Sequence, residues 1–159
     1  MIAADLAALA AALPRHQRLL GLDLGDKTIG LALSDPGLSV ASPITTIRRT
    51  KFTADAKMLL ALVAERGVGG LVIGLPLNMD GSEGPRCQSV RQFAANLLKL
   101  KDMPILFWDE RMSTMAVERA MIDHDVTRAK RDKVVDQAAA AFILQGVLDA
   151  LARTKASSN

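Results

Sequence analysis

The sequence has few of the residues that build aromatic, disulfide or zinc sites. Its aromatic residues are four Phe and one Trp, and it has no Tyr. A platform on which nucleobases stack, as in single-strand-binding proteins, is therefore not expected. The single cysteine, Cys87, cannot form an internal disulfide, and one Cys with two His cannot make a zinc cluster. These counts fit a reducing compartment, so we expect a cytoplasmic protein.

A hydrophobic run long enough to cross a bilayer is also missing. The apolar run over residues 2–13 is too short, contains Asp5 and has no basic segment before it. We interpret residues 1–17 as an N-terminal extension, either an amphipathic helix or a loosely packed segment. No membrane partner is expected.

Neither sign of charge dominates the chain. Twenty basic and 17 acidic residues give a net charge of +3. This mild excess permits a polyanionic partner but equally fits an ordinary solvated surface. A chain of 159 residues, half of them hydrophobic, is large enough for one domain with a proper core. We predict that domain over residues 18–152, followed by a flexible polar tail over 153–159.

The pattern of apolar residues predicts an α/β fold with a mixed five-stranded sheet and helices on both faces. Strands are predicted over 19–24, 29–34, 44–49, 70–74 and 105–108, and helices over 53–66, 86–100, 113–122 and 133–152. Thr53 is the expected N-cap of the first of these helices. Residues 124–133 are highly charged and have no apolar period, which favours a mobile loop. Its part 128–133 is a candidate nucleic-acid contact or lid.

Acidic residues adjoin three of these apolar elements. Asp23 lies near the end of the first strand, Asp109 and Glu110 follow the last strand, and Asp136 shares a face with apolar residues of the last helix. Each has an ordinary explanation: a turn-forming Asp, a solvated strand end, and an acid in the first turn of a helix. A carboxylate inside a buried strand nevertheless costs several kcal/mol unless it is compensated.

Taken together, the acids favour a metal site, although spacing along the sequence does not establish that they converge. Converging carboxylates raise each other's pKa, and a divalent cation removes that penalty. Oxygen ligands favour magnesium or manganese over zinc. Two such ions about 4 Å apart can activate a water and stabilise the leaving oxygen of a phosphodiester.

Four segments resemble the YqgF (also called RuvX) family of bacterial pre-16S rRNA nucleases and Holliday-junction-resolvase-like proteins. They are residues 22–35, 72–81, 109–114 and 135–139, and the resemblance covers about residues 18–150. It implies a ribonuclease-H-like fold and a nuclease site with Mg²⁺ or Mn²⁺, expected as two ions. By position, Asp23, Glu110 and Asp136 would be the catalytic metal ligands. Asp23 would be the central one, and Asp26 would be dispensable.

The chain departs from the related RuvC-type resolvases in one respect. Those proteins carry an acid in the fourth strand, whereas residues 71–74 here contain none. The second carboxylate must therefore come from Asp109 or Glu110. Residues 1–17 are extra to the family core, and the sequence assigns them no role.

Residues beside these acids are candidates to bind nucleic acid. The loop 78–82 offers amide and hydroxyl groups to phosphate oxygens at the start of the next helix, or else forms a turn on Asp-Gly. The basic candidates can contact phosphates but are equally typical of a solvated surface. The full set is Lys27, Asn78, Asp80, Gly81, Arg86, Arg111 and Ser113.

These features lead to one hypothesis and three alternatives. The hypothesis is a metal-dependent endonuclease on structured RNA, acting in 5′-end maturation of pre-16S rRNA, with the ribosome as a further candidate partner. The first alternative is a Holliday junction resolvase on branched DNA, which needs a two-fold dimer; the sequence leaves monomer and homodimer open. The second is a non-catalytic nucleic-acid-binding or ribosome-associated factor. The third is an actin-like or sugar-kinase ATPase half-domain, for which the chain is short.

Overall fold

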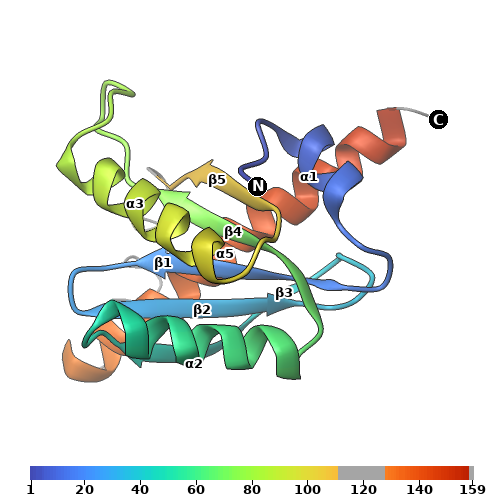
Figure 1. Cartoon of the computed structure of the whole chain (residues 1–159). Helices are drawn as coiled ribbons and strands as arrows, with labels where there is room; N and C mark the ends of the chain where they lie inside the picture. The colour runs from blue at the N-terminus through green and yellow to red at the C-terminus, as the bar shows by residue number, and fades with distance from the viewer. Residues whose placement is uncertain (111–127, 158–159) are drawn as a thin grey trace.

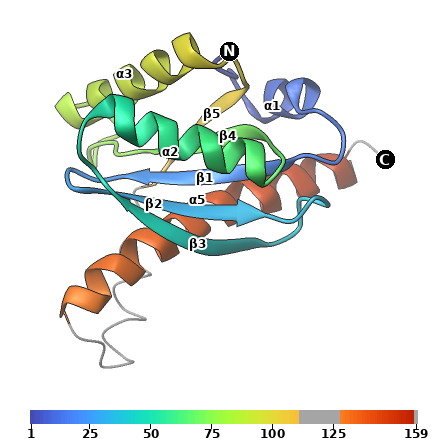
Figure 2. The same ribbon diagram turned by 60° about the horizontal axis from the view of Figure 1, so that its bottom comes forward.

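One mixed sheet, covered by helices on both faces, forms the body of the protein (Figures 1 and 2). The computed structural model describes residues 1–110 and 128–157. Within these ranges the elements are α1 (Leu6–Ala12), β1 (Arg18–Leu24), β2 (Thr28–Ser34), β3 (Ala41–Arg48), α2 (Phe52–Glu65), β4 (Val68–Leu75), α3 (Pro85–Leu100), β5 (Ile105–Asp109) and α5 (Arg128–Ser157). The predicted helix over 113–122 lies outside the described residues.

The strand order is β3-β2-β1-β4-β5, which confirms the predicted mixed five-stranded sheet. The first three strands form an antiparallel meander, and β1, β4 and β5 run parallel to one another. The carboxyl ends of β1, β4 and β5 therefore share one edge of the sheet, where Asp23 is the last but one residue of β1 and Asp109 the last of β5. Ligands of such sheets bind beyond these ends.

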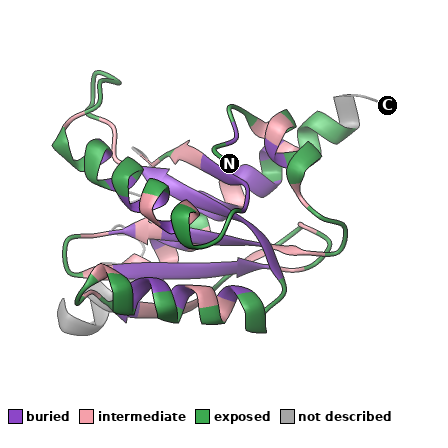
Figure 3. Ribbon diagram, viewed as in Figure 1, coloured by how far each residue is buried: buried purple, intermediate pink, exposed green. Residues whose placement is uncertain are grey.

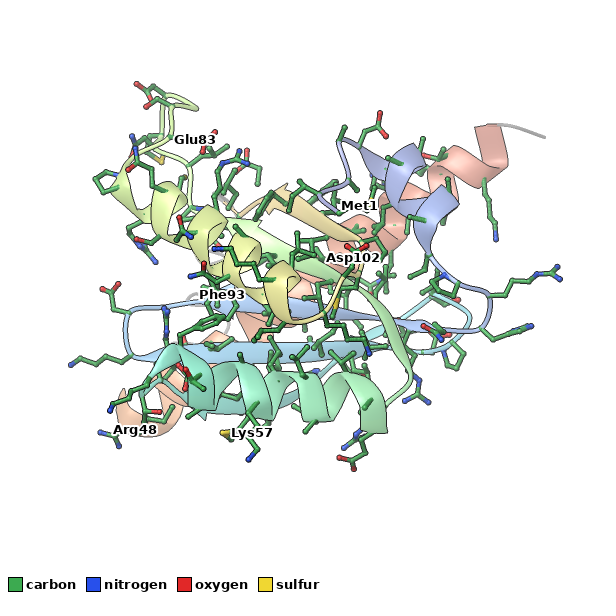
Figure 4. All side chains as sticks on the ribbon, viewed as in Figure 1. Met1, Arg48, Lys57, Glu83, Phe93 and Asp102 are labelled. Atoms are coloured by element: carbon green, nitrogen blue, oxygen red, sulfur yellow. The ribbon has the colours of Figure 1, made fainter. Side chains whose placement is uncertain are left out.

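The two faces of the sheet carry separate hydrophobic cores. On one face, Leu20 and Leu22 pack with buried residues of α2 and α3. The two helices touch through the rings of Phe52 and Phe93, whose centroids are 5.4 Å apart. Phe93 points from α3 toward α2 (Figure 4). On the other face, Leu19 of β1 packs against α5, which runs diagonally across the sheet (Figure 2). Every residue of β4 is buried, as its continuous apolar run predicts (Figure 3).

The N-terminal extension forms the amphipathic helix α1 and packs on the body. The Asp5 side chain accepts a hydrogen bond from the Ala8 amide at 2.8 Å and so caps the helix. Leu9 is fully buried in the core beneath α5. Before the helix, Ile2 forms a parallel bridge to Ile105, so the extension also covers part of the β5 edge. This packing keeps unpaired backbone groups of an edge strand away from other chains.

Two local predictions were wrong. The N-cap of α2 is Lys51 rather than Thr53, and the buried Asp55 carboxylate accepts hydrogen bonds from the Thr50 amide and hydroxyl. Helix α5 begins at Arg128, so residues 128–133 are helical rather than a loop. It continues to Ser157, into the predicted tail over 153–159, whose flexibility stays a prediction. None of the described helices is long and apolar enough to cross a membrane.

Leu9→Ala tests whether α1 is an integral part of the fold. Removing a fully buried leucine side chain should lower the free energy of unfolding by about 2–4 kcal/mol, measured by urea denaturation. Leu100→Ala is the matched control, because that leucine is 58% exposed at the end of α3 and should cost little. Equal effects of the two substitutions would show that the extension is only loosely attached.

Candidate active site

The Asp23 and Glu110 side chains meet at the carboxyl end of β1. Asp23 is the last but one residue of that strand, and Glu110 follows β5 directly. The two side chains are hydrogen-bonded, with the Glu110 carboxyl donating to the Asp23 carboxylate. Asp109 is exposed, so of the two acids left open by the sequence, Glu110 is the one that the structure brings to Asp23.

Burial and mutual repulsion shift the pKa values of both acids toward neutrality. Burial, followed by the negative charge of Asp136, raises the pKa of Asp23 to about 6. Burial, followed by the charge of Asp23, raises the pKa of Glu110 to about 7. The guanidinium of Arg86 opposes both shifts but does not cancel them. Such perturbed pairs are typical of functional sites, although structural ion clusters also produce them.

Asp136 reaches this site from α5, more than two helical turns after the helix begins at Arg128. It is therefore not an acid of the first turn, and interaction with the helix dipole does not account for it. Ala140 and Ile143 on the same face are buried, as predicted. The Thr28 hydroxyl donates a hydrogen bond to Asp136 Oδ2. The turn before Thr28 is closed by a 2.8 Å bond from the Gly25 amide to the Thr28 carbonyl, which fixes the start of β2.

Gly30 allows α5 to approach the sheet closely at this point. It pairs with Asp23 in the β1–β2 ladder. A Cβ at Gly30 would lie 2.0 Å from the carbonyl oxygen of Asp136, so no other residue fits without moving the helix. The helix backbone thus rests on the neighbour of Asp23, and this contact sets the distance between the two acids.

The chemistry of these donors fits a divalent cation. In residues 1–110 and 128–157, no three acidic, His or Cys side chains are close enough together to form a ready-made metal site. The charges of Asp23 and Glu110 nevertheless repel each other, and a cation bound by carboxylate oxygens would relieve that repulsion. Asp136 could join them as a third ligand if its carboxylate turned from Thr28.

A cavity of about 270 Å³ lies beside Glu110. Its lining includes Leu77, Asn78 and Gly84 of the loop between β4 and α3, which projects from the body of the protein (Figure 1). Asn78 and Arg86 line it together with Glu110. The structure thus brings two of the predicted nucleic-acid contacts next to the acids. Arg86 lies in the first turn of α3, where the free backbone N–H groups of the helix also favour anions.

The projecting loop is closed by its own hydrogen bonds. Asp80 accepts from the Ser82 amide and hydroxyl at 2.9 and 2.6 Å, and Asn78 donates to the Ser82 hydroxyl at 3.0 Å. Gly81 has a φ of 88°, which favours glycine. Asp80 and Gly81 therefore shape a turn, and their contact with nucleic acid stays a prediction.

Within the described residues, the structure does not bring the other predicted contacts to this cavity. Lys27 is exposed in the β1–β2 turn, and Arg111 and Ser113 lie outside the described residues. Two residues near the site were not predicted from the sequence. Arg49 donates to the Gly25 carbonyl at 2.7 Å and stacks over the Phe93 ring. Its position at the end of the predicted strand 44–49, which follows the acidic hairpin, was the available signal. Thr28 is the other, at the start of β2.

The sheet order, the long helix across one face and the acids at the end of β1 define a nuclease of the ribonuclease-H-like class. The chain belongs to the RuvX family, described as Holliday junction resolvases, whose family model matches residues 17–150. This confirms the family and the fold class predicted from the sequence. Nucleases of this fold generally depend on divalent metal ions.

Relatives and solved structures agree with this assignment. Proteins named "Putative pre-16S rRNA nuclease" match the chain in Paramagnetospirillum magneticum (66% identity over 143 residues, 90% of this chain and 92% of that protein) and Rhodospirillum centenum (62% over 152 residues, 92% and 81%). T. thermophilus RuvC in complex with its Holliday junction substrate has the same fold, with a TM-score of 0.52 at 12% identity over 87% of this chain and 96% of that one. The yeast mitochondrial Holliday junction resolvase Ydc2 has a TM-score of 0.52 at 13% identity, over 92% of this chain and 84% of that one.

The raised pKa values predict that stability falls as the pH rises. From about pH 4 to about pH 7 the native state binds more protons at Asp23 and Glu110 than the unfolded chain does, so the free energy of unfolding should decrease across this range, on the order of 2 kcal/mol. Glu110→Gln should flatten the decrease, because its amide donates to Asp23 without a charge. The free energy of unfolding is measured by urea denaturation at each pH in the presence of a metal chelator. Glu65→Gln is the control, because Glu65 is exposed. If the free energy of unfolding of Glu110→Gln fell with pH as steeply as that of the wild type, the interaction between Asp23 and Glu110 would not be the cause of the decrease.

Thr28→Val tests the link between β2 and Asp136. The substitution keeps the shape of a β-branched residue but removes the hydroxyl that holds Asp136. Nuclease activity should fall by about 10- to 100-fold while the free energy of unfolding changes little. Thr45→Val on β3 is a matched strand threonine away from the acids and should be silent. Unchanged activity in Thr28→Val would mean that Asp136 needs no support from Thr28.

Proposed function

We propose that the protein is a metal-dependent endonuclease that cleaves structured RNA in 5′-end maturation of pre-16S ribosomal RNA. The observation that supports this most strongly is the partly buried Asp23–Glu110 pair at the end of β1, with Asp136 close enough to repel Asp23. Relatives named as pre-16S rRNA nucleases at up to 66% identity support the RNA substrate. Because ribosomal RNA is made in the bacterial cytoplasm, we expect the protein to act there.

Each residue of the site would have a separate role in phosphodiester hydrolysis. Asp23 and Glu110 would hold a divalent cation in place of the hydrogen bond between them, and Asp136 would complete the ligand set. When bound, the metal would lower the pKa of a water and stabilise the leaving oxygen. Arg86 places a positive charge next to both acids, where it can bind a phosphate oxygen of the substrate. The cavity it shares with Asn78 has room for a phosphate beside Glu110.

Cleavage of branched DNA is the second candidate, because the matching family model is described as a Holliday junction resolvase. Two symmetric cuts would require a two-fold dimer. Cleavage of RNA and of branched DNA can be compared with one preparation of the protein, while sedimentation measures its oligomeric state.

Asp23→Asn should abolish cleavage, whereas Asp26→Asn should leave it nearly intact. Asp23 is partly buried and hydrogen-bonded to Glu110, while Asp26 is exposed in the turn that follows β1. Loss of the central ligand should cost about 10³-fold or more in rate. The assay uses a precursor 16S rRNA transcript and a synthetic four-way DNA junction, each with Mg²⁺ or Mn²⁺.

Cleavage of the transcript that depends on Asp23 supports the proposal. Cleavage of the junction alone, by a dimer, favours the resolvase. RNA binding without cleavage, unchanged in Asp23→Asn, would favour a non-catalytic binding protein.

A further inference from the structure

Asp23 lies between two glycines in adjacent strands. Gly30 of β2 pairs with it directly. On the other side β1 and β4 are parallel with Leu22 opposite Ile73, so Gly74 is the residue of β4 that comes alongside Asp23. Both glycines open toward α5: a Cβ at Gly30 would meet Asp136, and one at Gly74 would meet Ile143. Asp23 is thus flanked on both neighbouring strands by residues without a side chain.

The Glu110 carboxyl fills the space at Gly74. A Cβ built on Gly74 would lie 2.3 Å from Glu110 Oε2 and 3.3 Å from its Cδ. Glu110 itself comes after the end of β5, where its amide donates a 3.4 Å bond to the Leu75 carbonyl. Its side chain therefore folds back over β4 to reach Asp23. We propose that Gly74 is a positioning residue: because it has no side chain, the Glu110 carboxyl can occupy the space above it and reach Asp23. Its effect on catalysis rests on the proposed function.

The contacts at Gly74 differ from those at the other glycines under α5. At Gly30 the nearest atoms are backbone atoms of Asp136, and at Gly21 they are the Leu144 Cβ at 2.8 Å and the Ala140 carbonyl oxygen at 2.9 Å. Side chains there would force the helix to move. At Gly74 the two closest atoms are the ends of flexible side chains, Glu110 Oε2 and Ile143 Cδ1, the latter at 2.6 Å. These can rotate away, so packing of the helix alone does not require glycine at this position.

Backbone conformation does not require glycine there either. Gly67 and Gly81 have positive φ angles of 63° and 88°. Gly74 does not have a positive φ. It lies inside β4 and pairs with Trp108 of β5. An alanine is therefore compatible with the strand, and the conflict it creates is confined to Glu110 and Ile143.

Gly74→Ala is the test, with Mn²⁺ affinity measured by calorimetry on the full chain. The added methyl group should displace Glu110 from Asp23 and weaken Mn²⁺ binding by about 10-fold or more. In Glu110→Ala, whose own affinity is already reduced, adding Gly74→Ala should produce no further loss, because the group to be displaced is gone. A further loss of the same size in that background would overturn the proposal.

Ile143→Val separates positioning from packing. It removes Cδ1, the second atom that the new methyl group would meet. In the double variant Gly74→Ala/Ile143→Val, the unfolding midpoint in urea should return toward that of Ile143→Val alone, while Mn²⁺ binding stays weak. Recovery of full Mn²⁺ affinity in the double variant would show that crowding of Ile143, and not displacement of Glu110, is responsible.

Metal-free crystal structures distinguish failure of this inference from failure of the proposed function. Glu110 should contact Asp23 in the wild type and lie away from it in Gly74→Ala. If the wild type binds no Mn²⁺ and cleaves nothing but this displacement is seen, the proposed function fails and the role of Gly74 stands. If Glu110 keeps its place in Gly74→Ala, the inference is wrong whatever the activity.

Discussion

Repulsion between partly buried carboxyl groups at the end of β1 governs the whole arrangement of the site. Asp23 and Glu110 are partly shielded from water and hydrogen-bonded to each other, so both cannot readily carry a charge without compensation. Thr28 holds the third acid, and Arg86 supplies the nearby positive charge. The structure tolerates this arrangement at a cost in stability, and a divalent cation would relieve it.

The rest of the fold brings these groups together from distant parts of the chain. The hairpin of β1 and β2 supplies Asp23 and Thr28, the parallel strands β4 and β5 bring in Glu110, and α5 carries Asp136. Glycines in β1, β2 and β4 let the helix and the Glu110 side chain lie close to the sheet. The N-terminal extension packs on β5 and α5 but supplies no residue to this site.

Sequence patterns predicted the parts of the molecule that follow from local periodicity. The strand 70–74 and the helix 86–100 were recognised because their apolar residues have strand-like continuity and helical spacing. The start of α5 was missed because residues 128–133 are good helix formers without an apolar face. Contact between Thr28 and Asp136, which are 108 positions apart, depends on tertiary packing that no local pattern encodes. The choice of Glu110 over Asp109 likewise required the register of β4 and β5.

In this interpretation, a divalent cation binds between Asp23 and Glu110 and replaces the hydrogen bond between them. Anomalous diffraction from crystals soaked in Mn²⁺ shows where the cation binds. We expect a manganese peak contacted by carboxylate oxygens of both Asp23 and Glu110. Manganese bound elsewhere, with the two side chains still hydrogen-bonded to each other, would contradict it.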